Sequence, residues 1–136
     1  MSEDVIVQLA EYLAEKAGLE LGAELFYYSM PSEVDQCVVV QRTRSNRTVL
    51  PVIDAGMHAV RVAARSVSST AAYALAKLIY DAMDATDDEF IGDAPGFIEL
   101  AETPAYVTLY DNPQFCDQDQ QGRKVFEFYA LLTTKR

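Results

Sequence analysis

The most constraining feature of this 136-residue sequence is one long helical pattern with strand-type segments on both sides of it. Ser68 or Ser69 can cap a helix that runs to about Asp84, with apolar residues at helical spacing along it. Runs of β-branched and aromatic residues before and after it predict strands. Because strands and helices do not alternate along the chain, the pattern disfavours a parallel doubly wound sheet. It predicts an α+β fold with an antiparallel or mixed β-sheet and two main helices packed on one face.

The other helix and the strands are predicted from local periodicity. Near the N-terminus apolar residues recur at helical spacing, with Ser2 as the expected N-cap and Gly18 as the left-handed C-cap. The segment 48–53, interrupted by Pro51, is expected to be an edge strand or an extended connection. Pro104 is expected to separate two strands, and residues 111–121 are expected to form a polar loop. The remaining strands are expected at 23–30, 35–44, 57–65, 97–100, 105–110 and 124–134.

No internal repeat and no linker divides the chain, so residues 1–136 are predicted to form a single domain. Half of the residues are hydrophobic, which suffices for a packed core without metals or disulfides. Cys37 and Cys116 are too few for a disulfide framework, and Cys37 is expected to be buried. The acidic start disfavours an export signal, and no apolar run approaches the ~20 residues that a membrane helix needs. We therefore expect a protein that is made in the cytosol and does not associate with membranes.

Charge is both high and unevenly distributed. The formal net charge is −10, which disfavours general binding to nucleic acid because the phosphates would be repelled. Acidic residues dominate 1–35 and 81–119, whereas basic residues dominate 36–80 and 120–136. Such blocks are typical of a molecule with an acidic and a basic face, which favours head-to-tail association of identical copies. Ordinary solvated surface is the alternative interpretation.

Motifs for catalysis or cofactor binding are missing from the sequence. It has neither a phosphate-binding glycine-rich loop nor a nucleophile elbow. His58, the single histidine, lies among small apolar residues and is expected to be packed in the sheet or at its edge. Residues 117–122 imitate the first half of an EF-hand loop, but Phe128 stands where the bidentate glutamate is required. The sequence therefore predicts no enzyme activity, no metal site and no cofactor.

Charged clusters provide the candidate interaction residues. Arg42, Arg44 and Arg47 lie at a predicted strand end and turn, and Arg61 and Arg65 share one face of the strand 57–65. No aromatic platform is interleaved with them, so they are expected to contact an acidic surface of a neighbouring copy or partner, and not nucleic acid. Acidic residues at the end of the second helix are candidates for an interface or for repelling DNA, namely Asp84, Asp87, Asp88 and Glu89. Plain solvated surface is the alternative for both clusters.

Several segments taken together resemble a known family. An N-terminal helix leads to Leu21-Gly22, an aromatic strand closes in Met30-Pro31, and the run Cys37-Val38-Val39-Val40 follows. Val60 to Ser66 then leads into a helix that carries Tyr73, Ala74, Ala76, Ile79 and Tyr80. This order resembles the phage minor capsid proteins related to the tail terminators, or tail completion proteins, of long-tailed bacteriophages. The usual glycine-rich turn after the valine strand is replaced here by Thr43 to Arg47.

The resemblance implies a small α+β structural protein of the virion, found in the tail or neck and assembled in the host cytoplasm. It implies a ring, usually a hexamer, on the head-proximal end of the tail tube, where the ring stops tube growth. The implied partners are further copies of this chain, the tail tube protein, and the head-completion (stopper) or connector protein. Genome DNA is expected to pass through the ring without specific binding, along a lumen for which Asp84, Asp87, Asp88 and Glu89 are candidates.

Two alternatives stay open at this point. The chain could be a neck or head-completion protein that sits one layer nearer the capsid. It could also be a small cytosolic enzyme or ligand-binding domain that uses Phe26-Tyr27-Tyr28 as the wall of a pocket, although such an aromatic strip is more simply core and interface.

Overall fold

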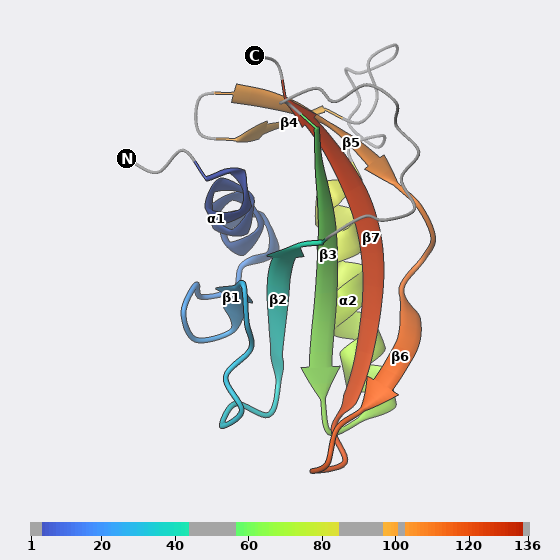
Figure 1. Ribbon diagram of the computed structural model, residues 1–136. Coiled ribbons are helices and arrows are strands. Elements are labelled where there is room, and N and C mark those ends of the chain that lie inside the picture. Colours follow the sequence, from blue (N-terminus) through green and yellow to red (C-terminus); the bar gives the residue numbers. More distant parts are fainter. Residues whose placement is uncertain (1–3, 44–56, 85–96, 101–102, 135–136) are drawn as a thin grey trace.

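The computed structural model describes residues 4–43, 57–84, 97–100 and 103–134, and these form one sheet with two helices against one of its faces (Figure 1). The elements in chain order are α1 (Val5–Ala17), β1 (Leu25–Tyr27), β2 (Cys37–Arg42), β3 (Met57–Ser66), α2 (Ser69–Met83), β4 (Phe97–Leu100), β5 (Thr103–Leu109), β6 (Gln114–Gln118) and β7 (Lys124–Thr134). This arrangement confirms the predicted α+β fold.

The sheet is built around two long central strands. β3 pairs with β2 on one side and, over all ten of its residues, with β7 on the other. The strand order is β1-β2-β3-β7-β5-β4, and β6 pairs with β7 along the same side as β5 but further from the C-terminus. β1 runs parallel to β2, whereas the other pairs are antiparallel, so the sheet is mixed.

Both helices begin and end at residues suited to capping. Asp4, and not the expected Ser2, caps α1, because the Asp4 carbonyl oxygen accepts the first helical bond from Gln8 and its carboxylate accepts from the Ile6 N–H at 2.9 Å. Gly18 ends the helix in the left-handed region with φ of 75°, as predicted. Ser68 caps α2 through a bond from the Ala71 N–H at 3.2 Å.

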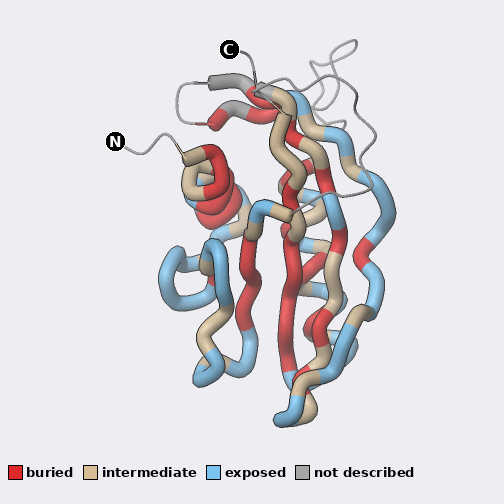
Figure 2. Tube along the Cα trace, viewed as in Figure 1, coloured by how far each residue is buried: buried red, intermediate tan, exposed pale blue. Residues whose placement is uncertain are grey.

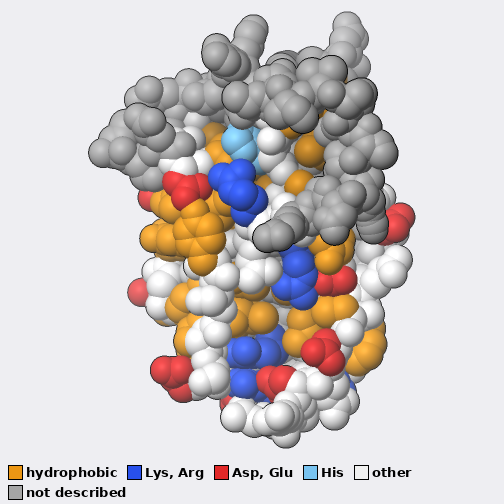
Figure 3. Space-filling view, viewed as in Figure 1, with side chains coloured by type: hydrophobic (Ala, Val, Ile, Leu, Met, Phe, Trp, Pro, Cys, Tyr) orange, Lys and Arg blue, Asp and Glu red, His pale blue; other side chains and the backbone are white. Residues whose placement is uncertain are grey.

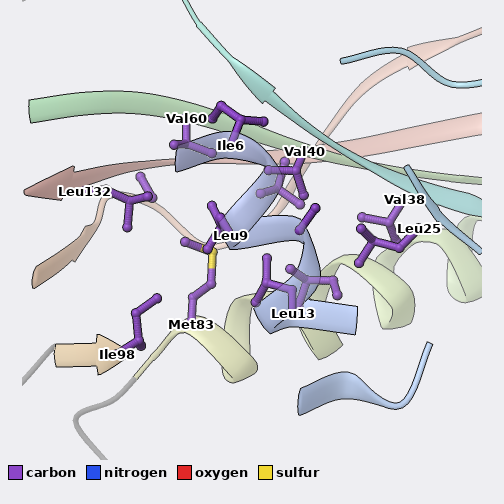
Figure 4. Packing of buried hydrophobic residues seen from close by; sticks show 14 of the residues in the cluster. Ile6, Leu9, Leu13, Leu25, Val38, Val40, Val60, Met83, Ile98 and Leu132 are labelled. Atoms are coloured by element: carbon purple, nitrogen blue, oxygen red, sulfur yellow. The ribbon is translucent and has the colours of Figure 1, made fainter. Parts of the chain in front are cut away.

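The main core lies between the helices and the sheet. Ile6, Leu9 and Leu13 project from α1 toward valines of β2 and β3, and Met83 of α2 joins them (Figure 4). Buried alanines of α2, Ala72 among them, allow that helix to approach β3 and β7 closely. Figure 2 shows the buried residues concentrated in the central strands and on the inner side of α1. Each fully buried aliphatic side chain contributes roughly 1.5–3 kcal/mol, so this layer is the main source of stability.

The opposite face of the sheet carries no helix in the described part of the chain. Its buried residues form a small second cluster of Val39, Ala63 and Val125, with Met30 and Cys116 packed against it. We call this side the open face. Cys37 is buried as expected.

Several predicted boundaries were wrong, for identifiable reasons. The aromatic strand is limited to β1, because Tyr28 takes a positive φ of 77° that ends the extended run. Pro104 lies inside β5 and does not separate two strands. Among the described residues, pairing of β5 with β7 begins at Ala105, and Pro104 pairs with Glu99 of β4. The predicted segment 48–53 lies outside the described residues.

The predicted polar loop 111–121 contains a strand, β6, and this prediction was also wrong. The turn Asp119 to Gly122 folds β6 back onto β7: the Gly122 N–H donates to the Asp119 carbonyl at 3.0 Å, and Gly122 has φ of 82°. Aspartate at the first position of a turn and glycine at the fourth indicate a tight turn of the kind that joins two strands. The prediction overlooked this signal because the segment is polar.

Candidate assembly surfaces

Arg61 is the centre of a polar group on the open face. Its Nε donates to Glu127 Oε1 at 2.6 Å and its Nη1 to Gln41 Oε1 at 2.8 Å, so three adjacent strands contribute one residue each. Burial alone would lower the pKa of Arg61, but the hydrogen bond and charge of Glu127 outweigh it and raise the pKa. The side chain keeps 26% of its surface exposed, so a partner on the open face would meet a charged but already paired group.

Figure 3 looks onto this face of the molecule. Lys and Arg side chains lie along its middle, and hydrophobic side chains are exposed on either side of them. Exposed hydrophobic side chains that lie together beside charged ones are typical of a surface that contacts another protein.

Arg65 and Arg123 are buried and hold one loop, residues 31–35, against the end of the sheet. Arg65, 7% exposed, donates to the carbonyl oxygens of Pro31 and Val34. Arg123, 4% exposed, donates to the carbonyl oxygens of Ser32 at 2.9 Å and Val34 at 3.1 Å. The guanidinium group of Arg65, which the sequence suggested for an interface, is thus engaged inside the chain.

Arg123 also pairs with Asp119 through its Nε at 2.8 Å, which ties the β6–β7 turn to the same loop. Because Arg123 lies 91 residues from Ser32 and 89 from Val34 in sequence, local patterns contain no sign of this arrangement. Charge-assisted bonds from a buried guanidinium group to backbone carbonyls are among the stronger polar contacts in a protein.

Arg42 belongs to a second charged group, at the other end of β2. Its guanidinium group lies 3.7 Å from the Asp4 carboxylate and 3.0 Å from His58 Nδ1. The Tyr28 hydroxyl donates to the same carboxylate. Burial and the nearby Arg42 charge lower the pKa of His58, so the imidazole is neutral at pH 7. With 46% of its side chain exposed, Arg42 is available to a neighbour.

Most of the remaining predicted site residues cannot be placed. Arg44, Arg47, Asp87, Asp88 and Glu89 lie outside the described residues. Asp84 is the C-cap of α2, where its backbone N–H donates to the carbonyl oxygens of Tyr80 and Asp81.

Exposed aromatic residues of β6 and α2 are the feature that sequence reasoning missed, whereas it did consider Tyr27 and Tyr28 as part of an interface. Ten of the large hydrophobic side chains in the described part of the chain are exposed, and they include Tyr27 at the end of β1, Tyr28 after it, Phe115 of β6 and Tyr73 of α2. Phe115 was assigned to a loop, and Tyr73 was counted only as part of a helix. The signal that could have found them is the hairpin turn after β6, which places Phe115 on a strand.

Within the described ranges, no group of three or more His, Cys, Asp or Glu side chains is placed to hold a metal ion. The calcium-like fragment at 117–122 is divided between β6 and the turn that follows it. Neither of the described helices combines the length and the apolar character that crossing a membrane requires.

These features define a small α+β protein that offers other proteins a bare sheet face and two apolar margins. The chain matches the model of the bacteriophage tail terminator protein family over residues 12–136. It belongs to that family. The match confirms the resemblance seen in the sequence and makes the protein a structural component of a phage tail, in contact with other tail or head proteins. No match was found among curated proteins.

Proposed function

We propose that this protein forms a closed ring, a hexamer, that caps the head-proximal end of the tail tube and joins it to the head. The observation that carries the proposal is the family match over residues 12–136. The ring stops the addition of tube subunits on one side and binds the head-completion protein on the other. Such a role needs extensive protein contacts, and the open face and apolar margins supply surface for them.

A ring of identical copies requires two different contact surfaces on each copy, so that every subunit meets its neighbour in the same way. Arg42 and Arg61 supply positive charge on the described surface, and Arg44 and Arg47 follow Arg42 in sequence. We assign these four arginines to contacts with acidic surfaces of a neighbouring copy or of a partner. Arg65 contributes indirectly, because it holds the 31–35 loop in place.

Genome DNA passes through the ring in this proposal. The formal net charge of −10 favours passage without adhesion, because like charges repel. Asp84, Asp87, Asp88 and Glu89 are assigned to the lumen. Replacement of Asp87, Asp88 and Glu89 by Asn, Asn and Gln should slow DNA passage and lower infectivity. Unchanged assembly, DNA passage and infectivity would remove the basis for this assignment.

The experiment that tests the ring is assembly with purified tail tubes followed by negative-stain imaging. We expect a ring at one end of each tube and tubes that no longer elongate when more tube protein is added. A protein that stays monomeric and binds no tube contradicts the proposal. Copurification with the portal or adaptor protein, and not with tube protein, would instead place the chain in the neck layer.

A further inference from the structure

His58 and Arg42 lie side by side, one on β3 and the other at the end of β2. Arg42 pairs with Val60 in the ladder between these strands, so His58 is two residues away along β3. The Nη1 atom of Arg42 lies 3.0 Å from the Nδ1 atom of His58. A guanidinium group only donates hydrogen bonds, so Nδ1 must be the acceptor in this contact. The neutral ring therefore carries its proton on Nε2.

Protonation of the ring is incompatible with this contact. An imidazolium ring has N–H groups at both nitrogen atoms, so Nδ1 can no longer accept a hydrogen bond from Arg42. The two side chains would then hold like charges at hydrogen-bond distance, which repulsion opposes. His58, the single histidine, is partly exposed and reaches the surface seen in Figure 3, so protons from solvent have access to it. Uptake of a proton therefore requires the guanidinium group to move away from the ring.

The other charged group at this corner is Asp4, the N-cap of α1. Its carboxylate lies 3.7 Å from Arg42 and accepts a hydrogen bond from the Tyr28 hydroxyl. On the β7 side, the residue opposite His58 is Leu132, which carries no charge. Burial lowers the pKa of His58 most, the charge of Arg42 lowers it further, and the charge of Asp4 raises it. The charges of Arg42 and Asp4 oppose each other, so a proton on His58 adds one unit of positive charge to a balanced pair.

We propose that His58 is a proton-sensitive switch for Arg42. While the ring is neutral, Nδ1 holds the guanidinium group beside β3. When the ring takes up a proton, the guanidinium group leaves it for solvent and for Asp4, and this corner of the surface becomes more positive. Acidification therefore makes Arg42 more available to an acidic surface. That consequence rests on the proposed function, which assigns Arg42 to such a contact, whereas the switch itself does not.

An NMR titration of the full chain tests the switch. It runs from about pH 7.5 to about pH 5, a range that includes the ordinary histidine pKa of 6.5. The ring signals need no further assignment because the chain has one histidine, and the Arg42 guanidinium signal is the one that Arg42→Met removes. We expect the neutral ring to carry its proton on Nε2. The Arg42 signal should shift with the same midpoint as the ring.

His58→Asn supplies a version of the contact that cannot titrate. The amide oxygen of asparagine can accept the bond that Nδ1 accepts in the wild type, but it takes up no proton in this range. The Arg42 signal of this variant should therefore stay constant from the start of the titration to its end.

A matched pair of substitutions tests the reverse effect, that of Arg42 on the ring. Arg42→Met removes the charge and the donor but keeps a long apolar stem, so the midpoint of His58 should rise. Arg61→Met is the control, because it removes the same charge from the same sheet at a group that pairs with Glu127. The midpoint of His58 should stay at the wild-type value in this control. If either methionine variant is unfolded by circular dichroism, the titrations of wild type and His58→Asn decide the question by themselves.

Three results would overturn the switch. They are a neutral ring with its proton on Nδ1, an Arg42 signal that stays constant while the wild-type ring titrates, and equal His58 midpoints in wild type and folded Arg42→Met. None of these measurements depends on assembly. Absence of wild-type rings, both alone and on tail tubes, therefore defeats the proposed function, and the titration still decides the switch.

Binding to purified tail tubes at the two ends of the pH range tests the consequence for Arg42. We expect wild type to gain affinity for the tubes at the lower pH relative to His58→Asn. The same pH dependence in both proteins would show that the released Arg42 does not contribute to this contact.

Discussion

Replacement of Arg123 by alanine should lower the free energy of unfolding far more than the same replacement of Arg61. Arg123 is 4% exposed and donates to the carbonyl oxygens of Ser32 and Val34, as well as to Asp119 at 2.8 Å. The substitution leaves the Ser32 carbonyl without its charged donor, at about 1 kcal/mol because the exposed loop lets water reach it in part, whereas the Val34 carbonyl keeps its bond from Arg65. With the lost Asp119 contact and the lost packing of the stem, we expect a total loss of about 3 kcal/mol.

Arg61→Ala is the matched control, since it removes the same side chain from the same sheet. Arg61 is 26% exposed and its pair with Glu127 is partly solvated, so its removal should cost about 1 kcal/mol. Urea unfolding followed by circular dichroism measures both losses. All proteins are compared at one concentration, because assembly of folded copies raises the apparent stability.

The two substitutions should therefore differ by about 2 kcal/mol, with unchanged urea dependence. Arg123→Lys should fall between them, because a lysine keeps the charge but lacks the planar guanidinium fork, whose separate Nε and Nη1 groups reach Asp119 and Ser32 together. Equal losses for Arg123→Ala and Arg61→Ala would refute the reasoning. It would mean that the 31–35 loop is held by contacts other than the buried guanidinium group.

Three further substitutions or titrations test other parts of the structure. Leu13→Ala should cost about 3 kcal/mol in urea unfolding, because Leu13 is a completely buried residue of α1; a loss under 1 kcal/mol would contradict the packing of that helix against the sheet. Gly18→Ala should cost about 1 kcal/mol and Gly18→Asn less, because the φ of 75° strains other residues although no atom lies near; equal stability of all three would show that the cap does not need this conformation. His58, the single histidine, should titrate below its ordinary pKa of 6.5 in an NMR experiment. Because the unfolded chain then binds the proton more readily, stability should fall as the pH drops through about 6.5, and His58→Asn should reduce that fall; a midpoint at or above 6.5 would contradict the burial of the ring beside Arg42.

Local patterns were sufficient for most elements of the fold. Apolar residues three and four apart predicted both helices, and Gly18 and Ser68 marked two of their four ends, since caps depend on neighbours within one turn. Alternation along 57–65 placed Val60, Val62 and Ala64 together on the buried face, which the structure confirms. The same alternation placed Arg61 on the other face, where it lies.

Only the tertiary structure decided which elements are neighbours and what the charged residues do. Leu25 pairs with Val38 in a parallel ladder, Arg61 meets Glu127 sixty-six residues away, and Arg123 reaches back to Ser32. No helical or strand periodicity in the sequence predicts these contacts, because each depends on how the whole sheet brings distant segments together. Phe115 shows the same limit: its polar neighbours predicted a loop, and pairing with β7 made it a strand with an exposed ring at the margin of the sheet. The sequence by itself determined the helices, the central strands and the family, and the sheet's long-range pairing determined the surfaces available for assembly.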